Sequence, residues 1–151
     1  MKENSKKLRE KASVEVRAIK SKTLADKIKK QLIISWGEWQ SNYEGWVNWT
    51  KSLYNEDATI CINNKVNQNF CDYKERMKSR LEDFNIEIGP IIKMIVESSV
   101  AAFVYHMYLT SNRGDNIETY DIVINEFNTF EEVDGKLMVT HLDLYANTII
   151  I

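Results

Sequence analysis

The chain has 151 residues, of which 44% are hydrophobic and 28% are charged, with one proline and five glycines. This length suits a single domain that buries its own core, and this composition excludes a largely disordered chain. No apolar stretch approaches the roughly 20 residues that cross a bilayer, so we expect no membrane among the partners.

The charge is distributed unevenly along the chain. The net charge is only −2, yet the first 30 residues are strongly basic and the remainder is acidic. A basic arm can attract nucleic acid, but this one has no interleaved aromatic residues for base stacking. We therefore expect a basic helical extension over residues 1–22, a single domain over residues 23–151, and no nucleic acid among the partners.

Other features concern the compartment and possible cofactors. The basic N-terminal residues are not followed by the apolar core of a signal peptide, so we expect a cytoplasmic protein. Cys61 and Cys71 lack the paired spacing of a zinc site and are expected to be reduced structural thiols. The sequence has no phosphate-binding loop and no nucleophilic serine motif, and we expect neither a metal nor an organic cofactor.

Helical spacing dominates the first half of the chain. Apolar residues three or four positions apart predict one helix over residues 5–21 and a second that begins at the capping box of Thr23 and Asp26. The predicted buried stripe of the second helix consists of Leu24, Ile28, Leu32 and Trp36. Gly37 and Gly45 are expected to break or bend this stretch, which gives two consecutive helices.

An aromatic series follows on one side of this helical region. Its members step by three or four positions and are Trp36, Trp39, Tyr43, Trp46, Trp49 and Leu53. Tryptophan side chains are so large that core packing alone explains the series. The sharper interpretation is that some of them form the wall of a pocket.

The middle of the chain is predicted to form a short strand, a loop and a third helix. Alternating apolar and polar residues over 58–63 predict a short strand, and the polar stretch 63–69 is expected to be a loop. Asp72 and Glu75 then resemble a helix start. This third helix should end near Phe84.

From residue 86 onward the hydrophobic period changes from helical to strand-like. Strands are predicted over residues 90–97, 100–110, 117–133 and 136–148, with turns at Ser98–Ser99 and Asp134–Gly135 and a loop at 111–116. The closing segment 148–151 has high β-propensity and should pair with the sheet or bury against a partner. Helices followed by strands predict an α+β fold, with the helices packed on one face of a mostly antiparallel sheet.

Two segments resemble a known family. The approach to the first strand, "YNEDATI", and the last strand with its turn, "DGKLMVTHLDLYAN", resemble the SnoaL-like branch of the nuclear transport factor 2-like superfamily, over roughly residues 24–147. The residues that match its most specific motif are Gly135, Lys136, His141 and Asp143. Leu142 departs from the family, which has tryptophan there, and the Gly-Arg that often precedes the third helix is absent.

This resemblance implies a cone, or cystatin-like roll, in which a strongly curved sheet wraps around a long helix and encloses a cavity. It also implies a homodimer that forms through the outer surface of the sheet. For activity, it implies metal-free proton transfer on a small, largely apolar cyclic molecule, as in polyketide cyclases, ketosteroid isomerases and dehydratases. The alternative is a non-catalytic ligand-binding or protein-interaction module of the same fold.

The last strand supplies the first candidates for catalysis. Strand residues i and i+2 share a face, so His141, Asp143 and Tyr145 should point the same way, with Leu137 and Val139 beneath them. On a concave face, Asp143 would fix the tautomer of His141 or act as the base itself. The alternatives are that the two side chains only hydrogen-bond to each other, that they contact a dimer partner, or that they face solvent.

Other residues could join this site. Asp121 is the second candidate for the catalytic base, and Asp57 is a weaker one. His106 shares a strand face with Tyr108 and either lines the pocket or is a hydrogen-bonded core residue. The residues expected to bind the ligand are His106, Trp36, Trp39, Tyr43, Trp49, Tyr54, Tyr105 and Tyr108.

Overall fold

The computed structural model describes residues 24–112, 114 and 117–147. The predicted helix over residues 5–21, the Thr23 half of the capping box and the closing segment 148–151 lie outside the described residues. So does the basic extension expected over residues 1–22.

Three helices occupy the first half of the described chain: the first helix at residues 24–37, α2 (Tyr43–Lys51) and α3 (Phe70–Asp83). The first helix buries Ile28 and Leu32 completely, as predicted, but Leu24 is 40% exposed. The reason is geometric, because each four-residue step rotates about 40° around a helix of 3.6 residues per turn. Residues at the end of such a stripe therefore turn away from the core.

The two predicted breaks behave differently. The first helix does end at Gly37, but Gly45 lies inside α2. The side chain of Asn42 caps α2 by accepting a hydrogen bond from the backbone N–H of Gly45. A Cβ added at Gly45 would lie 2.7 Å from the Cβ of Gln40. This glycine therefore permits a close approach of the preceding loop and does not interrupt the helix.

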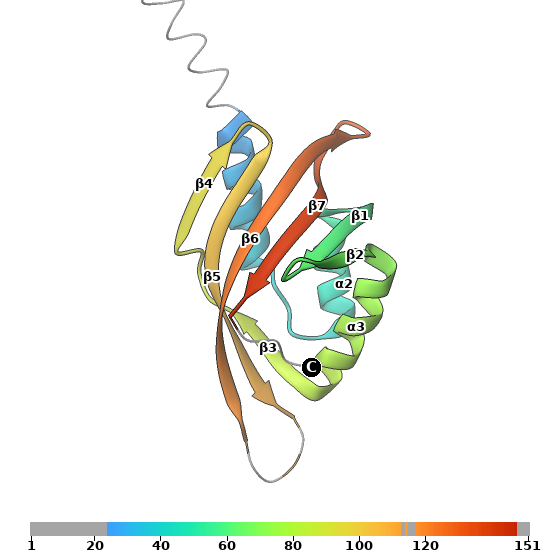
Figure 1. Ribbon diagram of the computed structural model, residues 1–151, viewed down its shortest axis with the longest axis vertical. Helices are drawn as coiled ribbons and strands as arrows, with labels where there is room; N and C mark the ends of the chain where they lie inside the picture. The colour runs from blue at the N-terminus through green and yellow to red at the C-terminus, as the bar shows by residue number, and fades with distance from the viewer. Residues whose placement is uncertain (1–23, 113, 115–116, 148–151) are drawn as a thin grey trace, which may run out of the picture.

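The second half forms most of a seven-stranded sheet (Figure 1). Its strands are β1 (Tyr54–Ile62), β2 (Lys65–Asn69), β3 (Phe84–Ile88), β4 (Lys93–Glu97), β5 (Val100–Ser111), β6 (Thr119–Val133) and β7 (Lys136–Ala146). The strand order is β2-β1-β7-β6-β5-β3, and β4 pairs with the other half of β5. All neighbours are antiparallel except β1 and β7.

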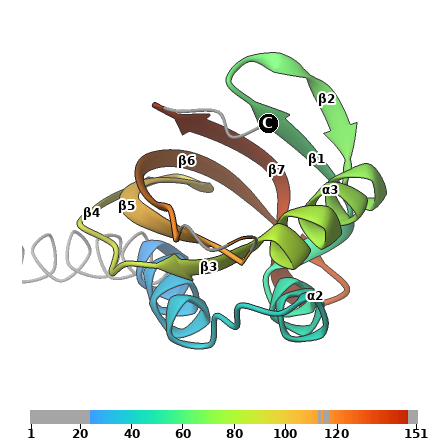
Figure 2. The ribbon, with the colours of Figure 1, turned by 90° about the horizontal axis from the view of Figure 1, so that it is seen from below.

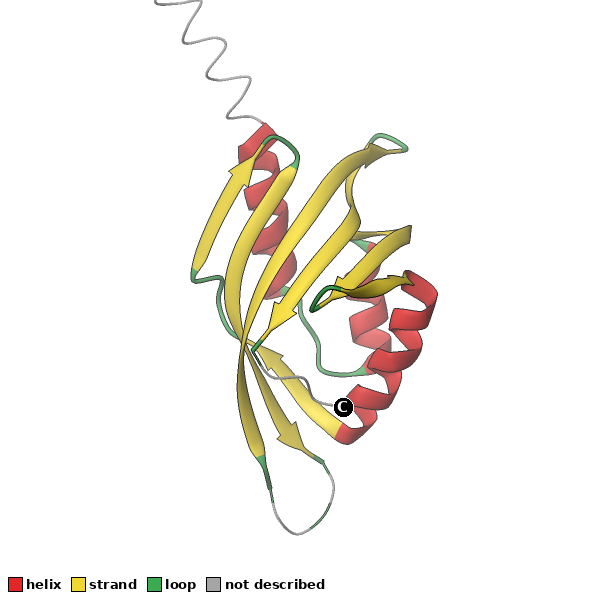
Figure 3. Ribbon diagram, in the orientation of Figure 1, coloured by secondary structure: helices red, strands yellow, loops and turns green. Residues whose placement is uncertain are grey.

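The sheet curls around the helices. Seen from below, it curves from β2 through β6 to β3, and the helices cover the open side (Figure 2). Figure 3 shows the helices, in red, behind and to the right of the strands, in yellow. The α+β cone with a curved, mostly antiparallel sheet is therefore confirmed. In the described part of the chain, no helix has the length and apolar character needed to span a membrane.

Two local predictions around the first hairpin are wrong. The expected loop over residues 63–69 contains β2, which pairs with β1 through a tight turn. Asn63 and Asn64 have φ values of 49° and 60° in that turn, and asparagine tolerates this region better than most residues. Strand β1 also begins at Tyr54, four residues before the alternation that predicted it.

The start of α3 also differs from its prediction. Asn69 caps the helix by accepting from the backbone N–H of Asp72 at 2.8 Å, so the helix begins three residues before the expected position. Its end, at Phe84, is as predicted. The short strand β3 follows at once and was not predicted separately, because five residues carry too little periodicity.

Strands β5 and β6 follow their predicted alternation. Ser98 and the Asp134–Gly135 pair have positive φ values in the two predicted turns. Along β5 and β6, alternate side chains pack into the concave face, where Phe103 and Tyr105 contact Trp36 of the first helix. The buried residues of these two strands include Ala101, Phe103, Tyr105, Leu109, Ile122, Ile124, Glu126, Asn128 and Phe130. Two of them, Glu126 and Asn128, are polar.

Candidate functional site

A β-bulge in β7 decides where the predicted catalytic pair lies. In the register of β6 and β7, Thr129 pairs with His141 and Phe130 pairs with Val139, so Thr140 is an extra residue. The core face therefore passes from Val139 to Leu142, both at most 1% exposed. The prediction that Val139 lies beneath His141 is wrong, because one inserted residue reverses the alternation.

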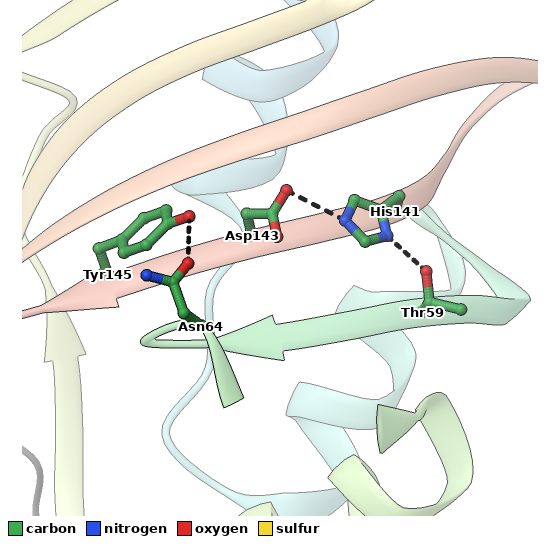
Figure 4. Close-up of polar contacts among 5 residues, drawn as sticks. All are labelled: Thr59, Asn64, His141, Asp143 and Tyr145. Carbon is green, nitrogen blue, oxygen red and sulfur yellow. Dashed lines mark hydrogen bonds and ion pairs between the residues drawn. The ribbon is translucent and has the colours of Figure 1, made fainter. Parts of the chain in front are cut away.

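As a result, His141, Asp143 and Tyr145 project from the outer surface of the sheet (Figure 4). The Nε2 atom of His141 lies 3.0 Å from a carboxylate oxygen of Asp143, and its Nδ1 atom lies 2.5 Å from the hydroxyl of Thr59 on β1. The side chains of His141 and Asp143 are 34% and 33% exposed. The two predicted residues are thus in contact, and they lie on the face of the sheet opposite the core. Their catalytic role stays a prediction.

Cys61 belongs to the same outer cluster. Strands β1 and β7 run parallel, and their register places Cys61 beside Asp143 and Thr59 beside His141. Partial burial and the charge of Asp143 raise the pKa of the Cys61 thiol. The cluster therefore brings a thiol, an imidazole and a carboxylate together.

A second imidazole–carboxylate pair lies on the same surface. The Nδ1 atom of His106 lies 2.6 Å from a carboxylate oxygen of Asp121, and the imidazole stacks on Tyr108 at a centroid distance of 6.0 Å. The side chains of His106 and Asp121 are 33% and 56% exposed. The alternative of a buried core imidazole is therefore wrong, and neither residue points toward the helices. Asp57 is exposed on β1.

The concave face holds a different titratable group, Glu126, which is only 3% exposed. The hydroxyl of Tyr105 donates a hydrogen bond of 2.5 Å to its Oε1 atom, and its Oε2 atom has no hydrogen-bond partner among the described residues. Burial raises the pKa of Glu126 to about 7. The bond from Tyr105 opposes this rise, as does the Asn128 amide, which is close but lacks normal hydrogen-bond geometry.

Glu126 reaches an aromatic chamber of about 30 Å³ between the sheet and the helices. Of the residues expected to bind a ligand, five line this chamber: Trp36, Trp39, Trp49, Tyr54 and Tyr105. The aromatic rings of the wall make edge-to-face contacts, with the ring centroid of Trp36 5.1 Å from that of Tyr105. Tyr43 lies instead at a shallow surface hollow beside Lys74. His106 and Tyr108 are on the outer surface.

The chamber adjoins a second pocket of about 70 Å³ that is lined mainly by apolar residues. The two share Tyr73, Met77, Met107 and Leu144. Arg80 and Asn63 also line the second pocket. The concave side therefore has two small, mostly apolar pockets that adjoin each other. Glu126 lines the aromatic chamber and not the second pocket.

The tyrosines of the chamber are hydrogen-bond donors. Burial raises the pKa of Tyr54 and Tyr105 well above the usual value and raises the pKa of Tyr73 to about 12. The negative charge of Glu126 is the second largest cause for all three residues. All three phenols therefore keep their protons throughout the physiological range. Such hydroxyl groups can stabilise negative charge that develops on a ligand oxygen.

Glu126 was not among the candidate residues, although the sequence carries a signal for it. Ile122, Ile124 and Phe130 share its strand face, and all are apolar and buried. A carboxylate inside such an alternation breaks the pattern of a buried face. The catalytic candidates Asp121, His141 and Asp143 lie on the other face of the same sheet.

Comparisons with known proteins agree with this architecture. The chain matches no protein-family model and no curated protein sequence. AclR, a candidate hydroxylase from Streptomyces galilaeus, is 15% identical with a TM-score of 0.61, over 79% of this chain and 87% of that one. A candidate SnoaL-like polyketide cyclase from Jannaschia sp. CCS1 is 10% identical with a TM-score of 0.58, over 84% and 87% of the two chains. BvnE pinacolase from Penicillium brevicompactum is 15% identical with a TM-score of 0.57, over 79% and 87%.

At these identities the likeness shows the fold alone. These structures include a candidate SnoaL-like polyketide cyclase, and the curved, mostly antiparallel sheet with its helices agrees with the cone that the resemblance of the last strand implies. This chain therefore has the same α+β cone fold as these solved structures.

Proposed function

We propose that the protein binds a small, largely apolar cyclic molecule inside the cone and exchanges a proton with it through Glu126. The observation that carries this proposal is a carboxyl group only 3% exposed, with a pKa of about 7, in an aromatic chamber. A group that titrates near neutral pH can both accept and donate a proton. The likeness of fold to a candidate polyketide cyclase supports the same class of chemistry.

The proposed reaction is an acid–base isomerisation without a metal, in which a C=C bond near the carbonyl group changes position. The Glu126 carboxylate removes a proton from the carbon beside a carbonyl group, and the electron pair of the C–H bond moves into an enolate. The hydroxyl of Tyr54 donates to the enolate oxygen. Protonated Glu126 then returns the proton to another carbon, so that no oxidant or reductant is needed.

The two pockets set the size and polarity of the ligand. Spaces of about 30 and 70 Å³ accommodate a few water-sized groups, which is less than a substituted ring needs. Met77 and Met107 line both spaces, and methionine side chains change conformation easily. A ring would enter by displacing these two side chains while the tryptophan wall stays in place.

The test uses 3-cyclohexenone, whose isomerisation to the conjugated 2-cyclohexenone is followed by ultraviolet absorbance. Glu126→Gln should lower the rate by roughly a hundredfold or more, because it removes the proton acceptor and keeps the shape. Glu131→Gln, on the exposed face of the same strand, is the matched control and should keep the wild-type rate. Binding is measured separately by quenching of tryptophan fluorescence with 2-cyclohexenone.

Two outcomes would contradict the proposal. If Glu126→Gln retains the rate while His141→Ala or Asp143→Asn loses it, the outer pair is the catalytic one, as predicted from the sequence. If no cyclic ketone or phenol quenches the fluorescence or raises the melting temperature, the cone does not bind such ligands.

A second candidate function is a non-catalytic binding module that assembles through the outer sheet surface. Three large apolar residues are exposed there: Ile95, Tyr108 and Phe127, at 56%, 41% and 43%. A second copy of the chain is the occupant we propose, since the same patch on two copies forms a self-complementary interface. In sedimentation velocity, Phe127→Asp should convert dimer to monomer, whereas Ile117→Asp in a loop should not. A wild-type monomer at every concentration would exclude this assembly.

A further inference from the structure

The outer surface of the sheet carries a cluster that the proposed function does not use. One suitable ligand atom from each of Cys61, His141 and Asp143 lies within 4.8 Å of the others. Two features of the fold assemble them: the parallel register of β1 and β7 sets Cys61 beside Asp143, and the bulge at Thr140 turns His141 outward. The cluster lies across the sheet from Glu126.

We propose that Cys61, His141 and Asp143 form a binding site for a zinc-like divalent cation on the outer surface of the sheet. A set of one sulfur, one nitrogen and one oxygen favours zinc over calcium or magnesium, which prefer oxygen alone. In a tetrahedral zinc site the ligand atoms are about 3.5 Å apart. The three ligand atoms of this cluster lie within 4.8 Å of one another, and small rotations of their partly exposed side chains would bring them to this separation.

The orientation of His141 supports this assignment. Its Nδ1 atom is held by the Thr59 hydroxyl at 2.5 Å, which directs its Nε2 atom toward Asp143 at 3.0 Å (Figure 4). Metal-binding histidines commonly have the second ring nitrogen fixed by such a partner. A cation in place of the shared proton between His141 and Asp143 would be bound by both side chains, with the sulfur of Cys61 as third ligand.

Charge balance and coordination number fit the same assignment. The thiolate of Cys61 and the carboxylate of Asp143 together contribute two negative charges, which a divalent cation neutralises. The protein then supplies three ligands, so the fourth position of the cation is available for water or another small ligand. All three side chains are partly exposed, which gives a cation access from solvent.

The experiment uses the full chain in reduced form, titrated with Co²⁺ as a spectroscopic probe and with Zn²⁺ alone by calorimetry. We expect one ion per chain, a thiolate-to-cobalt charge-transfer band in the near ultraviolet, and visible bands of a four-coordinate ion. Cys61→Ser should abolish the charge-transfer band. Thr59→Val should weaken Zn²⁺ binding by roughly ten- to a hundredfold, because it releases the imidazole.

The chain offers two matched controls. Cys71→Ser removes its other thiol, which is exposed on α3, and should leave the band unchanged. His106→Ala removes the other imidazole–carboxylate pair of the same surface and should leave Zn²⁺ affinity unchanged. Near-ultraviolet circular dichroism confirms that each variant is folded. The proposal is overturned if folded wild-type protein gives no thiolate band, or if Cys71→Ser loses the band and Cys61→Ser keeps it.

Discussion

The hydroxyl of Tyr105 on β5 donates a hydrogen bond of 2.5 Å to the carboxyl group of Glu126 on β6, within the aromatic chamber. This bond and burial act on the acid in opposite directions. Burial disfavours the charged carboxylate, whereas the phenol stabilises it. The net result is an acid with a pKa of about 7. The titration of Glu126 should therefore change both the free energy of unfolding and the NMR signal of its carboxyl carbon.

Glu126 should make the protein less stable as the pH rises. Its pKa moves from 4.5 to about 7 on folding, so the folded state binds more protons between these values. The free energy of unfolding is therefore highest below pH 4.5, falls as the pH rises to about 7 and is then level, with a total change of about 3 kcal/mol from this group. Urea unfolding of wild type and Glu126→Gln at several pH values should show this loss in the wild type only. An identical pH dependence in both proteins would contradict the assigned pKa.

Tyr105→Phe should raise the pKa of Glu126 above 7, because it removes the hydrogen bond that stabilises the carboxylate. It should also lower the free energy of unfolding by about 1 kcal/mol near pH 5, where Glu126 of the folded state is protonated in both proteins, and by more at pH 8. The pKa is measured by carbon NMR of labelled glutamate, with Glu126→Gln used to assign the signal. Tyr54→Phe in the same chamber is the control and should move the titration midpoint much less.

The two glycines of the helical region should respond oppositely to alanine. An added Cβ at Gly45 would lie 2.2 Å from the side-chain oxygen of Gln40 and 2.7 Å from its Cβ, so Gly45→Ala should cost about 1–3 kcal/mol. No atom lies within 4 Å of a Cβ added at Gly37, and Gly37→Ala should be stabilising by up to about 1 kcal/mol. Thermal unfolding of the pair distinguishes the two sites. Equal effects would mean that the close approach at Gln40 is absent in solution.

Much of the fold could be predicted because its signals are local. The strands β5 and β6 are specified by the alternation of apolar and polar residues along them. The hairpin between β6 and β7 is specified by its turn residues, Asp134 and Gly135. The errors occur where the signal is short or where another element decides the outcome. Strand β2 was missed because its turn uses two asparagines without a glycine. Strand β3 was missed because its five residues carry too little periodicity and follow a helix with no loop.

The candidate sites depend on relationships between distant residues, which no local pattern reports. The pairing of Cys61 with Asp143 requires the parallel register of β1 with β7, and 82 residues separate Thr59 from His141. The spacing of the cysteines along the sequence therefore gives no sign of this cluster. Glu126 was visible as a carboxylate in an apolar face, but only the packed tryptophans reveal that this face is a chamber.

The bulge at Thr140 can be tested by comparing two neighbouring residues of β7. Regular alternation from Val139 would bury His141 and expose Leu142, whereas the structure leaves Leu142 1% exposed and turns His141 to the outer surface. Leu142→Ala should therefore cost about 2–5 kcal/mol, because it creates a cavity in the core. His141→Ala removes only surface contacts with Thr59 and Asp143 and should cost about 1 kcal/mol or less. Urea unfolding of both variants at one pH gives the comparison. A larger loss for His141→Ala than for Leu142→Ala would show that the strand alternates without a bulge and that its histidine faces the inside of the cone.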